Sequence, residues 1–132
     1  MRVNDDYKEW NVERKFNDEQ SVYAFYKRAL IVRKQYEVLV CQVISWERIL
    51  TPFGQIYGDF EDISVGDEKI FAFVRRLGSA KALVVLNFSD AEVEFHPGEW
   101  SEGGYQIVLS NYHDDETAVR MRRFEGRVYV AI

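Results

Sequence analysis

The chain has 132 residues, 47% hydrophobic and 15% aromatic, which is enough for one globular domain and excludes intrinsic disorder. No stretch approaches the roughly 20 apolar residues of a membrane span. The 17 basic and 22 acidic residues, with a net charge of −5, argue against a general polyanion binder. One cysteine, Cys41, excludes a disulfide framework and a cysteine zinc site. Because residues 1–6 are too polar for a signal peptide, we expect a cytoplasmic protein.

Residues 18–36 predict one amphipathic helix. Asn17 and Gln20 have the spacing of a capping box at its start. Apolar side chains follow the spacing of a buried helical stripe: Val22, Phe25, Tyr26, Ala29, Leu30 and Tyr36. Basic residues fill the C-terminal half of this segment, where the helix dipole favours them. Such a helix has to bury its stripe, either on the rest of the domain or on something absent from this chain.

Beyond residue 57 the pattern becomes that of strands. Turn residues such as Gly, Asp, Ser and Pro separate several short β-rich runs: 60–63, 70–74, 82–86, 93–95, 105–109 and 127–132. Short strands joined by hairpin-length turns indicate an antiparallel sandwich or barrel rather than an alternating α/β sheet. The expected fold class is therefore mainly β with one N-terminal helix.

Three acidic clusters are candidates for catalysis or metal binding: Asp5 with Asp6, Asp59 with Glu61, and Asp114-Asp115-Glu116. Glycoside hydrolysis needs two carboxyl groups held at a fixed separation in a cleft, one of them with a raised pKa. Each cluster here lies at a turn or a strand edge, where solvated carboxylates are ordinary. We therefore assign catalytic and metal-binding roles to none of them.

Other polar and aromatic residues give no stronger indication of a site. Four arginines can suggest phosphate or nucleic-acid binding, but acidic residues lie just upstream and a paired surface strand is the better interpretation: Arg120, Arg122, Arg123 and Arg127. His96 and His113 stand where turn residues are expected. Three tryptophans can stack on sugars but are far apart in sequence: Trp10, Trp46 and Trp100. There is no phosphate-binding glycine loop and no nucleophile elbow, so no cofactor is predicted.

The order of segments carries more information than any single residue. Residues 3–12, followed by a helix that contains Leu-Ile-Val-Arg-Lys at 30–34, are similar to the end of the catalytic barrel in α-glucosidases of the α-amylase family. Four later strings resemble the C-terminal β domain of the same glycoside hydrolases: 57–60, 70–73, 83–89 and 124–129. The string Leu-Val-Val-Leu-Asn-Phe-Ser at 83–89 is the most telling of them. Among subgroups, the intracellular maltases and oligo-α-1,6-glucosidases are the most similar.

The resemblance implies the last helix of a (β/α)8 barrel followed by an antiparallel C-terminal β-sandwich. Residues 1–39 are then a remnant of the barrel and residues 56–132 are the sandwich. Such enzymes hydrolyse terminal α-glucosidic bonds of maltose-like or isomaltose-like sugars with retention. Their catalytic Asp, Glu and second Asp lie on barrel strands upstream of the equivalent of residue 3, so we expect this chain alone to be inactive. Its implied partner is the missing barrel in cis, with sugar bound only through the parent enzyme, and no nucleic acid or membrane.

Residues 40–55 depart from the family pattern, because removing them joins Val38-Leu39 to Ile56-Tyr57 in the family register. One interpretation is a translated intron: a valine codon supplies the donor GT at Val40, and Gln55 can be the acceptor CAG. Leu50-Thr51 can encode a branch site. The alternative is a genuine loop or extra strand, since residues 41–46 have strand character.

Two other functions stay open. A free-standing carbohydrate-binding β-sandwich module would need an exposed aromatic platform, and calorimetry with malto-oligosaccharides would identify it. A regulatory or transporter-associated member of the superfamily would use the β domain as a scaffold, and only the sequence upstream distinguishes it.

Overall fold

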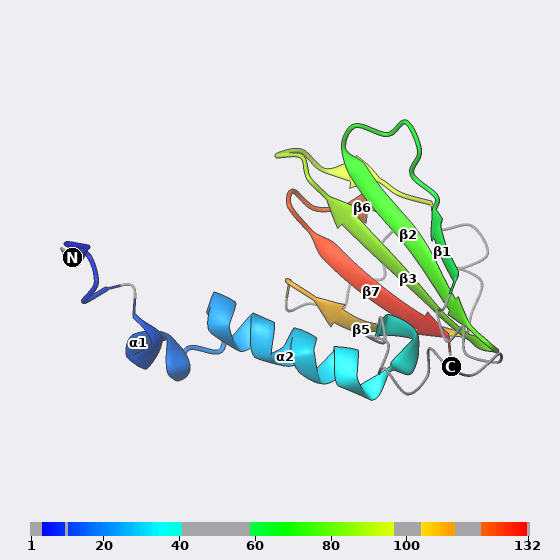
Figure 1. Cartoon of the computed structure of the whole chain (residues 1–132). Coiled ribbons are helices and arrows are strands. Elements are labelled where there is room, and N and C mark those ends of the chain that lie inside the picture. The colour runs from blue at the N-terminus through cyan, green and yellow to red at the C-terminus, as the bar shows by residue number, and fades with distance from the viewer. Residues whose placement is uncertain (1–3, 10, 41–58, 97–103, 113–119, 132) are drawn as a thin grey trace.

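The computed structural model describes residues 4–9, 11–40, 59–96, 104–112 and 120–131. It confirms a mainly antiparallel β protein with helices at the N-terminal end (Figure 1). The atypical segment 40–55 lies, from Cys41 onward, outside the described residues. In chain order the elements are α1 (Val12–Phe16), α2 (Val22–Gln35), the 3-10 helix η1 (Glu37–Leu39), β1 (Asp59–Asp62), β2 (Ile70–Leu77), β3 (Ala80–Asn87), β4 (Val93–Glu94), β5 (Tyr105–Ser110), β6 (Arg120–Met121) and β7 (Gly126–Ala131).

The main helix, α2, begins at Val22 and not at residue 18 as the sequence predicts, because Ser21 is its N-cap residue. A separate short helix, α1, precedes it. Asn11 caps α1, and its side-chain oxygen accepts from the Arg14 amide at 2.9 Å. Ser21 caps α2, and its hydroxyl oxygen accepts from the Ala24 amide at 3.1 Å. Asn17 is instead the C-cap residue of α1, so the predicted capping box at Asn17 and Gln20 is wrong. The side chain at position 21 competes successfully for the free amides of the first turn.

Five strands form one antiparallel sheet in the order β1-β2-β3-β7-β5. The central hairpin pairs β2 with β3 over their whole lengths, from Ile70 opposite Asn87 to Leu77 opposite Ala80. Gly78 opens its two-residue turn with φ 60°, a conformation that favours glycine. β7 pairs with β3 on one side and with β5 on the other, where the register shifts between Ile107 and Leu109. β1 and β5 are therefore the edge strands.

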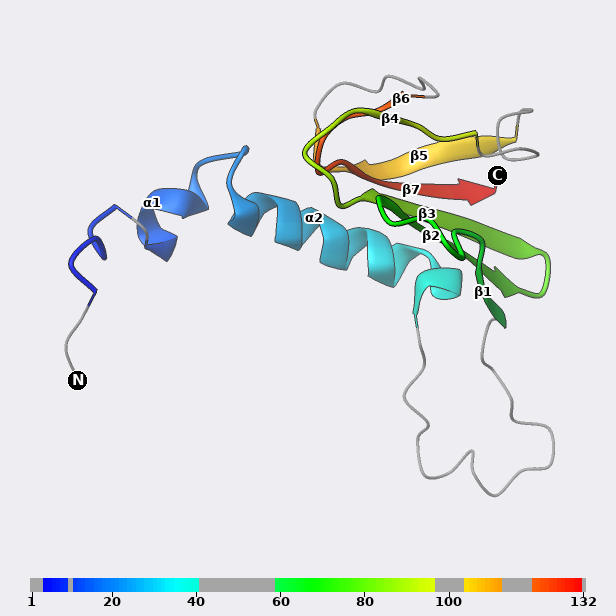
Figure 2. The ribbon, with the colours of Figure 1, turned by 90° about the horizontal axis from the view of Figure 1, so that it is seen from above.

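The sheet carries a hydrophobic core on each face. On one face the two-stranded sheet of β4 and β6 covers the larger core: Ile70, Ala72, Val74, Leu83, Val85 and Met121 (Figure 2). On the other face Val38 of η1 packs with Ala82 and Val130. Alternation along β2 and β3 produces both cores, because successive side chains of a strand point to opposite faces. The α1–α2 arm extends from this body beside β5 (Figures 1 and 2).

A buried polar network joins the end of β3 to the turn between β6 and β7. The side-chain amide of Asn87 donates to the carbonyl oxygens of Ala91 and Arg122, both at 2.8 Å. Arg127 Nε lies 2.7 Å from Glu125 Oε1, and its Nη2 lies 3.0 Å from Glu125 Oε2. Glu125 and Arg127 are each only 2% exposed. This network holds the turn that returns β7 to the centre of the sheet.

Candidate docking surface

The structure places the acidic candidates on exposed surface. Asp59 and Glu61 lie on the edge strand β1, where Arg76 Nη1 is 2.6 Å from Glu61 Oε2. Asp5 and Asp6 are exposed in the N-terminal turn. His113 and Asp114-Asp115-Glu116 lie outside the described residues. Within the described ranges, no three His, Cys, Asp or Glu residues cluster as metal ligands would.

The basic run divides into a surface part and a buried part. Arg120 confirms the expected surface pairing, since its guanidinium is 3.7 Å from carboxylate oxygens of both Glu92 and Glu94. The same expectation is wrong for Arg127, which is buried against Glu125. Burial alone would lower the pKa of Arg127, but hydrogen bonds with Glu125 and Tyr129 outweigh it and raise that pKa. One sequence feature pointed to this burial. Arg127 and Tyr129 alternate with Val128 and Val130 along β7, so the side chain of Arg127 lies on the same face of the strand as that of Tyr129.

Aromatic residues of the described chain do not form one flat surface. Trp10, Trp46 and Trp100 lie outside the described residues. On β1 and β2, the ring of Phe73 is 5.1 Å from that of Phe60 and 5.5 Å from that of Phe71, with tilts of 34° and 45°. These rings pack against one another at angles typical of aromatic clusters. His96, also weighed for chemistry, is an exposed residue just after β4, as expected for a turn.

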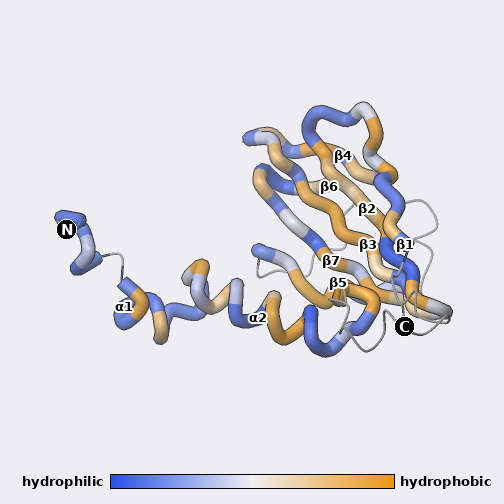
Figure 3. The backbone as a smooth tube through the Cα atoms, in the orientation of Figure 1, coloured by the Kyte–Doolittle hydropathy of each residue, from blue (hydrophilic) through white to orange (hydrophobic). Residues whose placement is uncertain are grey.

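The helix α2 has two apolar faces, and only one of them is covered. Phe25, Ala29 and Val32 are half-buried. Figure 3 shows that hydrophobic positions, in orange, alternate with hydrophilic ones along α2. We call three apolar residues spaced four apart the outer stripe, and they are 83%, 64% and 42% exposed: Val22, Tyr26 and Leu30. These three residues are therefore not covered by the described part of this chain, which agrees with the second of the two expectations, a cover that is absent from the chain.

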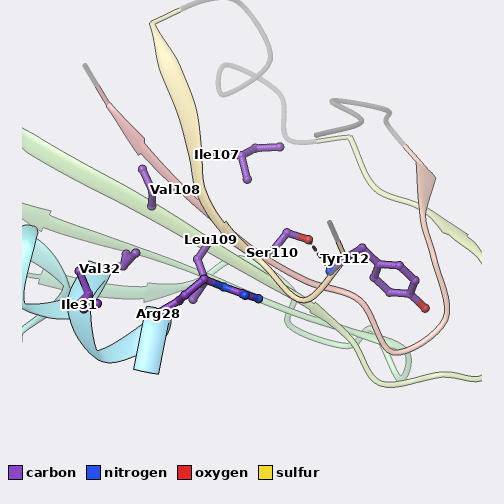
Figure 4. Close-up of a pocket in the computed structure, with 8 residues that line it drawn as sticks. All are labelled: Arg28, Ile31, Val32, Ile107, Val108, Leu109, Ser110 and Tyr112. Carbon is purple, nitrogen blue, oxygen red and sulfur yellow. Dashed lines mark hydrogen bonds between the residues drawn. The ribbon is translucent and has the colours of Figure 1, made fainter. Parts of the chain in front are cut away.

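The contact between α2 and the sheet is loose. A groove of about 340 Å³ opens between α2 and β5, with Arg28, Ile31 and Val32 on the helix side and Val108 and Leu109 on the strand side (Figure 4). A second hollow of about 590 Å³ lies between α1 and α2. The two helices meet at an aromatic contact, where the rings of Phe16 and Tyr23 are 5.6 Å apart, and the Ser21 hydroxyl donates to the Lys15 carbonyl oxygen at 2.9 Å. The arm thus presents apolar surface that packing within the described ranges leaves open, and large patches of this kind mark interaction sites.

Comparisons with known proteins agree on one family over nearly the whole chain. A family model described as the C-terminal all-β domain of α-amylase matches residues 60–128. The α-glucosidase of Candida albicans is 34% identical over 131 residues, which cover 98% of this chain and 20% of that protein. An oligo-1,6-glucosidase of Parageobacillus thermoglucosidasius is 31% identical over 132 residues, covering 96% of this chain and 21% of that protein. This chain therefore spans about a fifth of the length of these relatives.

Solved structures give the same fold. The trehalose-6-phosphate hydrolase of Bacillus licheniformis superposes with a TM-score of 0.75 at 27% identity, covering 100% of this chain and 22% of that one. The isomaltulose synthase of a Klebsiella species gives a TM-score of 0.77 at 22% identity, covering 100% and 21%, which is a likeness of fold alone. Together these findings confirm the resemblance and the fold class predicted from sequence.

Proposed function

This chain belongs to the family of α-amylase C-terminal all-β domains, and from that premise we propose that it braces the catalytic (β/α)8 barrel of a longer α-glucosidase. The observation that carries the proposal is the outer stripe of α2. Its three apolar side chains are open, although the helix that bears them is well capped and regular. A barrel packed on α2 would bury them, at about 1.5–3 kcal/mol for each fully covered side chain.

The proposal divides the chain by role. Residues 1–39 would be the last loop and helix of the barrel, and residues 56–132 the β domain that supports it. The parent enzyme would hydrolyse terminal α-glucosidic bonds of maltose-like or isomaltose-like sugars in carbohydrate metabolism, in the cytoplasm. We assign no catalytic, cofactor or metal residue to this chain and expect it to be inactive alone. In the described part of the chain, every helix is too short or too polar to cross a membrane.

Residues 40–55 are proposed to be a translated intron rather than part of the working protein. The support is the family register, which is continuous when Leu39 is joined directly to Ile56. Val40 and Gln55 can supply the donor and acceptor dinucleotides at the two ends. Deleting these residues should then leave the fold intact and raise the yield of soluble protein.

Co-expression with a barrel tests the bracing role. The Candida albicans relative, truncated before the segment that matches this chain, would be co-expressed with the tagged chain, and glucose release from maltose would be measured. We expect co-purification and activity from the pair and none from this chain alone. A Tyr26→Asp/Leu30→Asp variant should lose both, whereas Val65→Asp, at a residue 85% exposed in the loop before β2, should not.

Two results would contradict the bracing role. Glucose release by the purified chain would show that it carries its own catalytic groups. Failure of the pair to co-purify, together with calorimetric binding of malto-oligosaccharides to the chain alone, would favour the carbohydrate-binding module instead.

A further inference from the structure

The sequence contains one tripeptide of the form Asn-x-Ser/Thr, which is the acceptor motif for N-linked glycosylation. It is Asn87-Phe88-Ser89, at the end of β3 and in the turn that follows. Acceptor asparagines of glycoproteins lie at the surface, because the attached glycan is bulky and extends into solvent. Asn87 is only 3% exposed. The motif is therefore present in the sequence but buried in the fold.

The hydrogen-bonding groups of the Asn87 side chain are all used inside the β domain. Its nitrogen Nδ2, which has two N–H groups, donates to the carbonyl oxygens of Ala91 and Arg122, both at 2.8 Å. Its oxygen Oδ1 accepts from the backbone amide of Ser89 at 2.9 Å and from the Ser89 hydroxyl at 2.7 Å. The atom that would carry a glycan is therefore held between the turn after β3 and the turn before β7.

Glycan transfer is chemically incompatible with these contacts. The transferase forms a bond between Asn Nδ2 and C1 of the first sugar of a lipid-linked oligosaccharide, the lipid diphosphate leaves, and the nitrogen loses one proton. A single N–H then remains for the carbonyl oxygens of Ala91 and Arg122, so at least one of the two hydrogen bonds is lost. The sugar would also need space at a buried site. The two turns therefore cannot close around a glycosylated Asn87.

We propose that Asn87 is a glycosylation acceptor only in the unfolded chain, so that glycan attachment and folding of the β domain exclude each other. Once the chain has folded, the transferase depends on opening of the turns around Asn87, and fully unfolded molecules are only about 10⁻³ or less of a stable protein. A chain that enters the secretory pathway meets the transferase before it has folded. The inference is independent of the bracing role. It agrees with the proposed cytoplasmic location, because a cytoplasmic chain folds without meeting this transferase.

Translation in the presence of endoplasmic-reticulum microsomes tests both parts of the proposal. The whole chain would be fused to a cleavable signal peptide, with glycan occupancy read from the mobility shift that endoglycosidase H reverses and folding from resistance to trypsin. We expect the glycosylated molecules to be sensitive to trypsin. Molecules made with a competing Asn-Tyr-Thr tripeptide, which stay unglycosylated, should be resistant.

A variant that does not fold tests whether Asn87 is an acceptor at all. Leu83→Asp places a carboxylate at a core position that is 0% exposed, and it leaves the acceptor motif intact. Because this chain stays open to the transferase, its glycan occupancy should be several-fold higher than that of the unmodified chain.

Two further variants separate the position of the glycan from its presence. Ser89→Ala removes the motif and should fold without a glycan, because Asn87 Nδ2 keeps both of its acceptors. Adding Gly78→Asn/Ala80→Thr to that variant moves the motif to the exposed turn between β2 and β3. Gly78 has φ 60°, which asparagine tolerates, and a Cβ there meets no atom within 4 Å. Molecules glycosylated at this turn should stay resistant to trypsin.

Three results would overturn the proposal. Trypsin-resistant molecules with a glycan on Asn87 would show that the fold accommodates it. A Leu83→Asp chain without glycan would show that Asn87 is not an acceptor even when the chain is unfolded. Trypsin sensitivity of the molecules glycosylated at the turn between β2 and β3 would show that a glycan disrupts this chain whatever its position. None of these results bears on capture of the chain by a co-expressed barrel, so the bracing role is tested separately.

Discussion

The buried pair of Glu125 and Arg127 makes the sharpest prediction about the β domain. In Glu125→Ala the guanidinium of Arg127 stays in place without its carboxylate, in a side chain only 2% exposed. The Arg122 amide also loses its acceptor, because it donates to Glu125 Oε2 at 2.7 Å. The variant therefore removes the Glu125 carboxylate from a buried cation and from a backbone donor.

The expected loss follows from those two vacated interactions. Removing one partner of a buried ion pair costs about 3–5 kcal/mol, and an unsatisfied backbone donor costs about 1–3 kcal/mol. Domains of this size unfold with about 5–15 kcal/mol, so Glu125→Ala should lose a large part of its unfolding free energy. The double variant Glu125→Leu/Arg127→Met removes both charges and should recover at least about 2 kcal/mol relative to Glu125→Ala.

Urea unfolding followed by far-ultraviolet circular dichroism measures these differences. Glu61→Ala is the control, because its partner Arg76 is at the surface and such pairs contribute about 0–1 kcal/mol. The reasoning is refuted if Glu125→Ala unfolds within about 1 kcal/mol of the unmodified chain. It is also refuted if the double variant is as unstable as the sum of the two single variants, since that would mean no coupling.

Three further predictions concern the core, a turn and a close contact. Leu83→Ala should lower the unfolding free energy by about 2–5 kcal/mol because Leu83 is 0% exposed, whereas Val22→Ala, at 83% exposed, should change it by less than about 0.5 kcal/mol. The amides of Ile70 and Lys69 hold the pKa of Asp67 below 3.8, so its stabilising effect is complete above pH 3.8 and is lost as pH falls through the lowered value. Urea titrations should therefore show stability falling more steeply in this acid range for the unmodified chain than for Asp67→Asn. A Cβ added in Gly126→Ala would lie 2.9 Å from Leu86 Cδ2, the end of a flexible, half-buried side chain that can shift, so thermal unfolding should show a change of less than about 1 kcal/mol.

Local sequence pattern was sufficient to predict most of the sheet. The runs at 70–74 and 82–86 are β-rich and are separated by Gly78 and Ser79, so a hairpin was the natural expectation, and the structure confirms it. The family resemblance was confirmed by comparison, and the string at 83–89 has a physical basis in Asn87. Its side chain is buried and holds two carbonyl oxygens of neighbouring turns.

Tertiary contacts decided what the sequence pattern could not. The regular spacing of the helical stripe predicted that it has to be buried, but spacing cannot say whether the neighbour that covers Tyr26 or Leu30 lies in this chain or outside it. Arg127 was expected at the surface with Arg120, because the burial of an arginine depends on a partner such as Glu125 being brought to it by the fold. The start of α2 was misplaced because Asn17 and Ser21 are both good caps, and only the geometry of the turn between them selects Ser21.

The central claim is that this chain is the terminal part of a longer α-glucosidase, and a full-length read of the messenger RNA tests it most directly. The account predicts a reading frame that continues upstream of residue 3 through a (β/α)8 barrel, with codons 40–55 absent from the mature message. A message that retains codons 40–55 but continues upstream would refute only the intron interpretation. A message whose reading frame starts at Met1 would contradict the central claim.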